Sequence, residues 1–88
     1  MPSAPSVVRI HLFAAAREAV GASVLVWALP ARGMPAEALV RRLAAEHPKL
    51  RRTLRASRFV RNGEYLSDLK ARIRPGDEFA VHPPYGGG

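Results

Sequence analysis

The chain contains no cysteine, which excludes disulfide bonds, thiolate metal ligands and a cysteine nucleophile. Long apolar runs are also missing, since the richest stretch, residues 24–29, is far too short to cross a bilayer. The first six residues are small and rich in proline, without the basic and apolar regions of a signal peptide. We therefore expect a cytoplasmic protein with no membrane partner. A length of 88 residues indicates one domain, too small to frame a pocket between two domains.

Acidic residues are scarce, with 7 against 14 basic residues and a formal net charge of +7. All the basic residues except Lys49 and Lys70 are arginines, and one stretch gathers Arg41, Arg42, Arg51, Arg52, Arg55, Arg58 and Arg61. Such a cluster indicates an acidic partner more strongly than scattered charge does. No aromatic residue lies between Arg41 and Arg58 to stack on bases, so nucleic acid is disfavoured. A GC-rich genome is an alternative source of the arginines.

Two strands are predicted before residue 30. Apolar and polar residues alternate along residues 7–14, which is typical of a half-buried strand. A short helical turn is expected over residues 14–20, and Gly21 suits its left-handed exit. Residues 22–29 are rich in Val, Leu and Trp and stop at Pro30, so they predict a second strand, antiparallel to the first.

The hydrophobic period then changes to that of a helix. Pro35 is expected at the first helical position, and Pro48 ends the helix near His47. One apolar stripe marks the helix at Ala36, Leu39, Val40, Leu43 and Ala44. A second short, basic helical segment follows, in which Leu50 and Leu54 continue the apolar contact.

Three short strands complete the chain. Residues 58–62 predict the first of them, and Asn62-Gly63 indicates a hairpin turn because both residues tolerate positive φ. Residues 64–66 form the return strand, and residues 78–82 alternate again as the last strand.

This order of elements predicts a two-layer α+β domain, in which one main helix covers a small mixed sheet. It matches the β-grasp layout, where the last strand lies beside the first, although periodicity alone does not give the strand order. We expect a disordered N-terminal tail over residues 1–6, the domain over residues 7–82, and an extended C-terminal tail over residues 83–88.

The usual catalytic constellations are missing from the sequence. His11, His47 and His82 are distant from one another and lack metal-ligand spacing with a carboxylate, so no metal site is expected. The remaining candidate is the C-terminal segment Pro83-Pro84-Tyr85-Gly86-Gly87-Gly88. The prolines hold it extended, and six residues reach at most about 20 Å. Its glycines make it thin enough to thread a narrow channel and present the Gly88 carboxylate to another protein; a frayed end is the alternative.

Four motifs together resemble the MoaD/ThiS family of ubiquitin-like sulfur carriers, and most closely its molybdopterin synthase small subunits. They run in order across nearly the whole chain. The motifs are Phe13-Ala14-Ala15-Ala16-Arg17-Glu18 with Gly21, Asn62-Gly63-Glu64, Pro75-Gly76-Asp77-Glu78, and Pro83-Pro84-Tyr85-Gly86-Gly87-Gly88.

The resemblance implies a carrier that is not an enzyme on its own and binds no cofactor. An adenylating enzyme of the ubiquitin-activating type would use ATP to activate Gly88, and a sulfur donor would convert its carboxylate to a thiocarboxylate. The large subunit of molybdopterin synthase would then receive the tail, with Gly86 and Gly87 giving access. Sulfur would pass to a pterin precursor of the molybdenum cofactor.

Strand parity predicts a docking surface near the root of the tail. Phe13 falls on the face opposite the apolar residues of the first strand, and His82 falls opposite Phe79 and Val81. Tyr65, after the hairpin turn, is expected to join them. An exposed aromatic patch of this kind is typical of a docking surface.

Three positions depart from the family pattern: Arg61, His82 and the pair Tyr85-Gly86. They leave open a carrier of the same fold for thiamine, cysteine or tRNA thiolation, or for protein conjugation. The net charge leaves open a basic, non-catalytic binding module.

Overall fold

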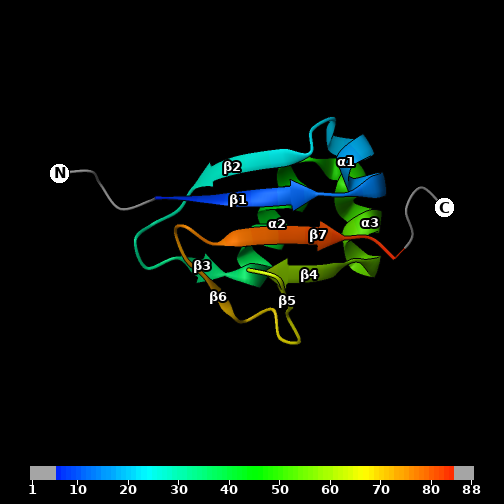
Figure 1. The fold of residues 1–88 in the computed structure, drawn as a ribbon. Helices are drawn as coiled ribbons and strands as arrows, with labels where there is room; N and C mark the ends of the chain where they lie inside the picture. The colour runs from blue at the N-terminus through cyan, green and yellow to red at the C-terminus, as the bar shows by residue number, and fades with distance from the viewer. Residues whose placement is uncertain (1–5, 85–88) are drawn as a thin grey trace.

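Alternation along the first strand decides which face of the sheet carries the core. In β1 (Val7–Leu12), the side chains of Val8, Ile10 and Leu12 are buried, whereas Arg9 is exposed. The computed structural model describes residues 6–84, and Figure 1 shows β1 within a five-stranded sheet. The order across this sheet is β2-β1-β7-β4-β5, and the other strands are β2 (Val24–Ala28), β4 (Arg58–Arg61), β5 (Glu64–Tyr65) and β7 (Glu78–His82).

The last strand lies at the centre of the sheet. β7 pairs in parallel with β1, where Phe79 is opposite Ile10, and antiparallel with β4, where Val81 is opposite Phe59. β1 and β2 form the predicted antiparallel pair. The mixed sheet confirms the predicted α+β class and the β-grasp layout.

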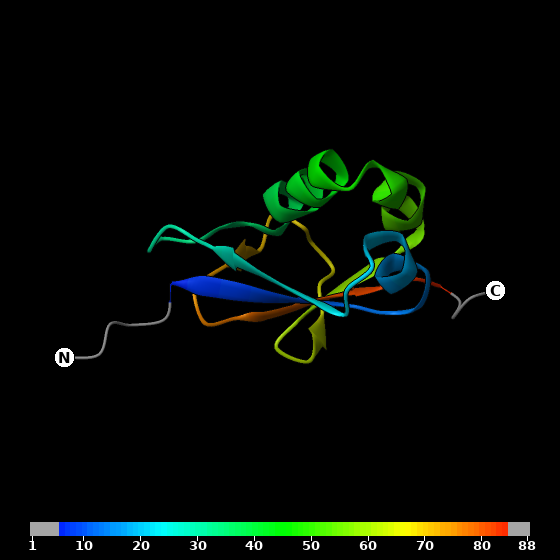
Figure 2. The same cartoon turned by 90° about the horizontal axis from the view of Figure 1, so that it is seen from above.

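Within residues 6–84, three α-helices cover one face of the sheet, as Figure 2 shows. α1 (Ala14–Val20) ends at Gly21, whose φ of 82° is the predicted left-handed exit. The main helix is α2 (Ala36–Glu46), followed by the 3-10 turn η1 (Pro48–Leu50) and by α3 (Arg51–Ala56). In this described part of the chain, no helix has the length and apolar character needed to span a membrane.

The core lies between the sheet and the helices. Leu39 and Leu43 of α2 are fully buried, and Leu50 and Leu54 extend the apolar contact past the end of that helix, as predicted. The sheet contributes Val8, Ile10, Leu12, Trp27, Phe59, Phe79 and Val81. The core cluster uses one face of the sheet. On the other face Val60 and Ala80 are also buried, and the remaining residues are available for other contacts.

A second sheet, made of two-residue strands, has no counterpart among the predicted elements. β3 (Met34–Pro35) pairs antiparallel with β6 (Arg72–Ile73). The sequence predicted Pro35 as the first helical residue, and this prediction was wrong. Pro35 is the extended N-cap residue of α2 and the last residue of β3. Next to it, Gly33 has a φ of +73°, and an added Cβ would lie 2.1 Å from the Ile73 carbonyl oxygen. This close backbone approach holds the entry of α2 against β6.

Candidate functional site

β7 delivers the C-terminal segment from the middle of the sheet, between β1 and β4. Phe79 and Val81 are fully buried, so alternation places His82 on the helix-free face, where Arg58 is its cross-strand neighbour. Pro83 is half-buried and Pro84 exposed. The other residues predicted to form the tail lie outside the described residues; they are Tyr85, Gly86, Gly87 and Gly88.

Three rings gather beside the end of β7. The centroids of the Phe13 and His82 rings are 4.8 Å apart, and those of Tyr65 and His82 are 6.0 Å apart in an edge-on arrangement. The exposed fractions are 44% for Phe13 and 62% for Tyr65, which are high for large apolar side chains. We call Phe13, Tyr65 and His82 the ring cluster. The structure brings all three together as strand parity predicted, and their role in binding stays a prediction.

Local backbone conformation explains how two of these rings reach the same place. Phe13 is the N-cap residue of α1 and keeps an extended backbone (φ −123°, ψ 153°), so it continues the alternation of β1 by one residue. Tyr65 pairs with Val60 across the predicted hairpin, whose turn residues Asn62 and Gly63 have φ values of 49° and 84°. Both rings consequently lie on the helix-free face.

Two further features of this face were not predicted as site residues. The Arg58 guanidinium lies 5.8 Å from the centre of the Tyr65 ring, within the range of a cation–π contact. Val24 and Val26 of β2 are also exposed, opposite His11 and Arg9. The alternation that placed His82 could have placed these three residues too, because Phe59 and Trp27 mark the buried parity of their strands.

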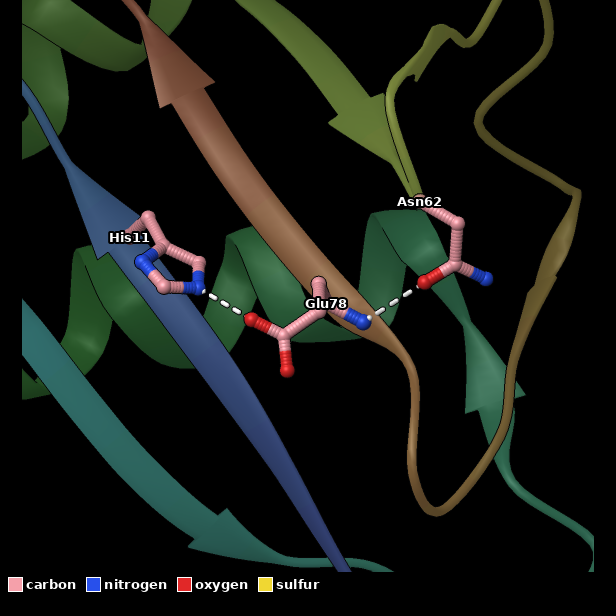
Figure 3. Close-up of polar contacts among 3 residues, drawn as sticks. All are labelled: His11, Asn62 and Glu78. Atoms are coloured by element: carbon pink, nitrogen blue, oxygen red, sulfur yellow. Dashed lines mark hydrogen bonds and ion pairs between the residues drawn. The ribbon is translucent and has the colours of Figure 1, made fainter.

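A polar network occupies the opposite end of β7. His11 Nε2 contacts Glu78 Oε1, and the backbone amide of Glu78 donates to the side-chain oxygen of Asn62 at 2.8 Å (Figure 3). Asn62 Nδ2 also donates to Asp77 Oδ1 at 3.0 Å, which ties the hairpin turn to the start of β7. Glu78 and His82 are four residue steps apart in β7, about 13 Å, whereas His11 is two residues from Phe13 on the same face. The network therefore supports the sheet beside the ring cluster.

The composition of the ring cluster resembles that of protein interfaces. Exposed aromatic rings beside an arginine are the residue types enriched at protein interfaces. The His82 imidazole and the Tyr65 hydroxyl are the groups of the cluster that could transfer a proton, and the His82 ring lies beside those of Phe13 and Tyr65. The described residues therefore bring exposed aromatic rings to the point where the C-terminal segment leaves the sheet, and their use as a docking surface stays a prediction.

Comparison with known proteins identifies the family. The sequence matches the ThiS family over residues 10–88. The chain belongs to the ThiS family. It is 35% identical over 81 residues to the molybdopterin synthase sulfur carrier subunit of Dictyostelium discoideum, covering 91% of this chain and 94% of the relative. The subunit of the same name from Chlamydomonas reinhardtii is 32% identical over 82 residues, covering 92% and 98%. The predicted family resemblance is thereby confirmed.

Solved structures share the fold of this ThiS-family chain. The crystal structure of SAMP1 from Haloferax volcanii superposes with a TM-score of 0.75 at 28% identity, covering 93% of this chain and 99% of that one. In the complex of subunits 1 and 2 of molybdopterin-converting factor from Helicobacter pylori, the similar chain gives a TM-score of 0.65 at 20% identity, covering 93% and 99%. At that identity the second likeness concerns the fold alone.

Proposed function

We propose that this chain is the sulfur carrier subunit of a molybdopterin synthase, with Gly88 as the sulfur-bearing residue. The observation that carries the proposal is the similarity, over nearly the whole chain, to two proteins that are themselves named molybdopterin synthase sulfur carrier subunits. The family match also runs through residue 88, so it includes the glycines of the C-terminal segment.

The proposed chemistry takes place in partner proteins, in the cytoplasm. An adenylating enzyme of the ubiquitin-activating type joins the Gly88 carboxylate to the AMP part of ATP and releases pyrophosphate. A hydrosulfide equivalent from a sulfur donor attacks the acyl carbon, AMP leaves, and the carboxylate becomes a thiocarboxylate. The large subunit then passes this sulfur to a pterin precursor. The carrier contributes no general acid or base and no bound cofactor.

The described residues support the docking part of this scheme. The ring cluster exposes apolar surface beside Pro83 and Pro84. A partner that takes residues 85–88 into its active site would have to bind the carrier at this surface. Glycines without Cβ atoms suit a narrow channel. The pairing of subunits 1 and 2 in the Helicobacter pylori complex is a property of those proteins, and it supports a large-subunit partner here.

Intact-mass spectrometry tests the proposal. The purified chain is incubated with its cognate adenylating enzyme, ATP and sulfide, and the expected product is heavier by the difference between sulfur and oxygen. A variant without Gly88 is the matched control, and it should keep its circular dichroism spectrum while gaining no sulfur. If the mass of the full chain does not change although the adenylating enzyme in the same incubation consumes ATP, the proposal is refuted.

A second candidate function follows from the likeness to SAMP1 and from the departures at Arg61, His82 and Tyr85-Gly86. The activated Gly88 would then serve another sulfur-transfer pathway or attach to a lysine of a target protein. Binding to a molybdopterin synthase large subunit distinguishes the two functions. Thiocarboxylate formation without such binding would favour the second candidate.

A further inference from the structure

A groove of about 850 Å³ opens between the helices and the β4–β5 hairpin. Its floor is apolar and belongs to the margin of the core, formed by Val40, Ala44, Leu54, Phe59, Leu66 and Leu69. α2 and α3 lie on the same side of the sheet, as Figure 2 shows. Residues of these two helices and of β4 and β5 line the groove. It thus presents apolar side chains that the fold itself leaves partly uncovered.

Four arginines line this groove: Arg41 of α2, Arg51 and Arg55 of α3, and Arg58 of β4. We call them the rim arginines. All four are exposed, and the groove lining includes no Asp or Glu. Residues 6–84 contain two ion pairs, His11–Glu78 and Arg42–Glu46, neither of which includes a rim arginine.

Other arginines of the same sequence cluster are used by the fold. Arg42 binds Glu46 at 2.6 Å and lies 4.1 Å from the centre of the Trp27 ring. Arg61 donates to the Arg72 carbonyl oxygen at 3.0 Å. Within the described chain the rim arginines meet no carboxylate, although Arg58 lies near the Tyr65 ring. The remaining arginine of the sequence cluster, Arg52, is exposed and does not line the groove.

The rim arrangement is unfavourable for the isolated domain. Arg51 and Arg55 are four residues apart on α3, a spacing at which like charges repel. Arg41 and Arg58 add positive charge to the same groove. A ligand that brings carboxylates to the rim and apolar groups to the floor would relieve the repulsion and cover the exposed apolar surface.

We propose that this groove binds an acidic, apolar segment of a partner protein, with carboxylates on the rim arginines and aliphatic or aromatic side chains on the floor. Charge complementarity selects an anionic occupant. The floor is aliphatic except for the buried Phe59, so Tyr65 is the one exposed ring in the groove lining on which a nucleobase could stack, and the floor favours apolar side chains. Because the rim arginines come from three different elements around an open groove, a segment with several carboxylates satisfies them better than one small anion does.

The groove adjoins the ring cluster, and its proposed binding role does not depend on sulfur transfer. Tyr65 lines the groove as well as belonging to the ring cluster, so the two surfaces are continuous. A protein docked on the ring cluster could place such a segment directly into the groove. The groove is assigned from its own charge and shape, and its test needs neither ATP nor a large subunit.

The direct test is a titration of the labelled full chain, followed by two-dimensional amide NMR. The probes are acetylated twelve-residue peptides that alternate Asp or Glu with Leu, Ile or Phe, at low and at high salt. The expected result is saturable shifts concentrated at groove residues such as Val40, Leu54 and Leu69, weakened by salt. Peptides with serine in place of the apolar residues should bind at least tenfold more weakly.

Two charge-reversed variants separate the groove from general attraction to a basic protein. The double variant Arg51→Glu/Arg55→Glu should lose at least tenfold in affinity. The control Arg17→Glu/Arg32→Glu changes net charge equally at exposed arginines outside the groove and should stay within about twofold. Equal losses in both variants, shifts spread over the whole surface, or no shifts at millimolar peptide would overturn the proposal. So would tighter groove binding by single-stranded DNA of twelve nucleotides.

Discussion

The two faces of the central sheet are built from the same strands but have opposite chemistry. In β7, Phe79 and Val81 are fully buried under the helices, while Glu78 and His82 of the helix-free face are only partly covered. The core on the covered face is apolar, whereas the helix-free face holds the His11–Glu78 contact and the ring cluster. A single strand can therefore serve stability on one side and recognition on the other, and substitutions on the two sides should have separable effects.

The largest effect is expected from Phe79→Ala on the covered face. Phe79 is fully buried and stacks on Phe59 at 5.8 Å, so truncation should lower the free energy of unfolding by about 3–5 kcal/mol. His82→Ala, on the other face of the same strand, should lower it by less than about 1 kcal/mol. Urea unfolding followed by circular dichroism measures both. Similar losses would show that the two faces do not divide stability from recognition.

A smaller loss of unfolding free energy is expected from a substitution at Gly33, where the backbone approaches β6 of the small sheet. Gly33→Ala places a Cβ against the Ile73 carbonyl at a positive φ, so we expect a loss of about 2–4 kcal/mol. The matched control is Gly21→Ala, which has a φ of +82° but no atom within 4 Å of an added Cβ. The control should lose only about 1 kcal/mol from backbone strain. Thermal unfolding of both variants checks this, and equal losses would exclude a role for the close approach.

Recognition by the helix-free face is tested by Phe13→Ala and Tyr65→Ala. Both rings are exposed, so stability should change little, while affinity for a molybdopterin synthase large subunit should fall tenfold or more, about 1.4 kcal/mol. Val26→Ala is the control, since Val26 is 58% exposed on the same face but lies in β2, outside the ring cluster. Calorimetric titration gives the affinities. A loss with Val26→Ala as large as with Phe13→Ala would place the interface elsewhere on this face.

The smallest effect belongs to the polar network of the same face. The side chains of His11 and Glu78 are 31% and 46% exposed, so their contact competes with water. A double-mutant cycle with His11→Gln and Glu78→Gln should give a coupling below about 1 kcal/mol in unfolding free energy. Large-subunit affinity should fall less than with Phe13→Ala, because Glu78 lies at the far end of β7 from His82 and His11 lies outside the ring cluster. A stronger coupling would make this pair a main support of the helix-free face.

Several parts of the fold were predictable because they rest on local rules. Alternation fixed the buried parity of β1 and β7, and Asn62-Gly63 fixed the hairpin, since positive φ suits both residues. The same parity placed Phe13 and His82 on the helix-free face. The small sheet could not be predicted, because two-residue strands at Met34–Pro35 and Arg72–Ile73 are too short for any periodicity.

The sequence by itself determined the larger elements, the apolar faces of β1 and β7 and the family, because these depend on residue spacing and ordered motifs. Only the tertiary structure decided which distant residues meet. Phe13, Tyr65 and His82 come together because β7 inserts beside β1 and the hairpin folds onto the same sheet. The rim arginines likewise surround one groove because α2, α3 and β4 converge there, whereas Arg42, from the same sequence cluster, faces Glu46 and Trp27. The spacing of residues along the chain specifies which face of a strand or helix is apolar, and the packing of elements against one another specifies which residues form a common site.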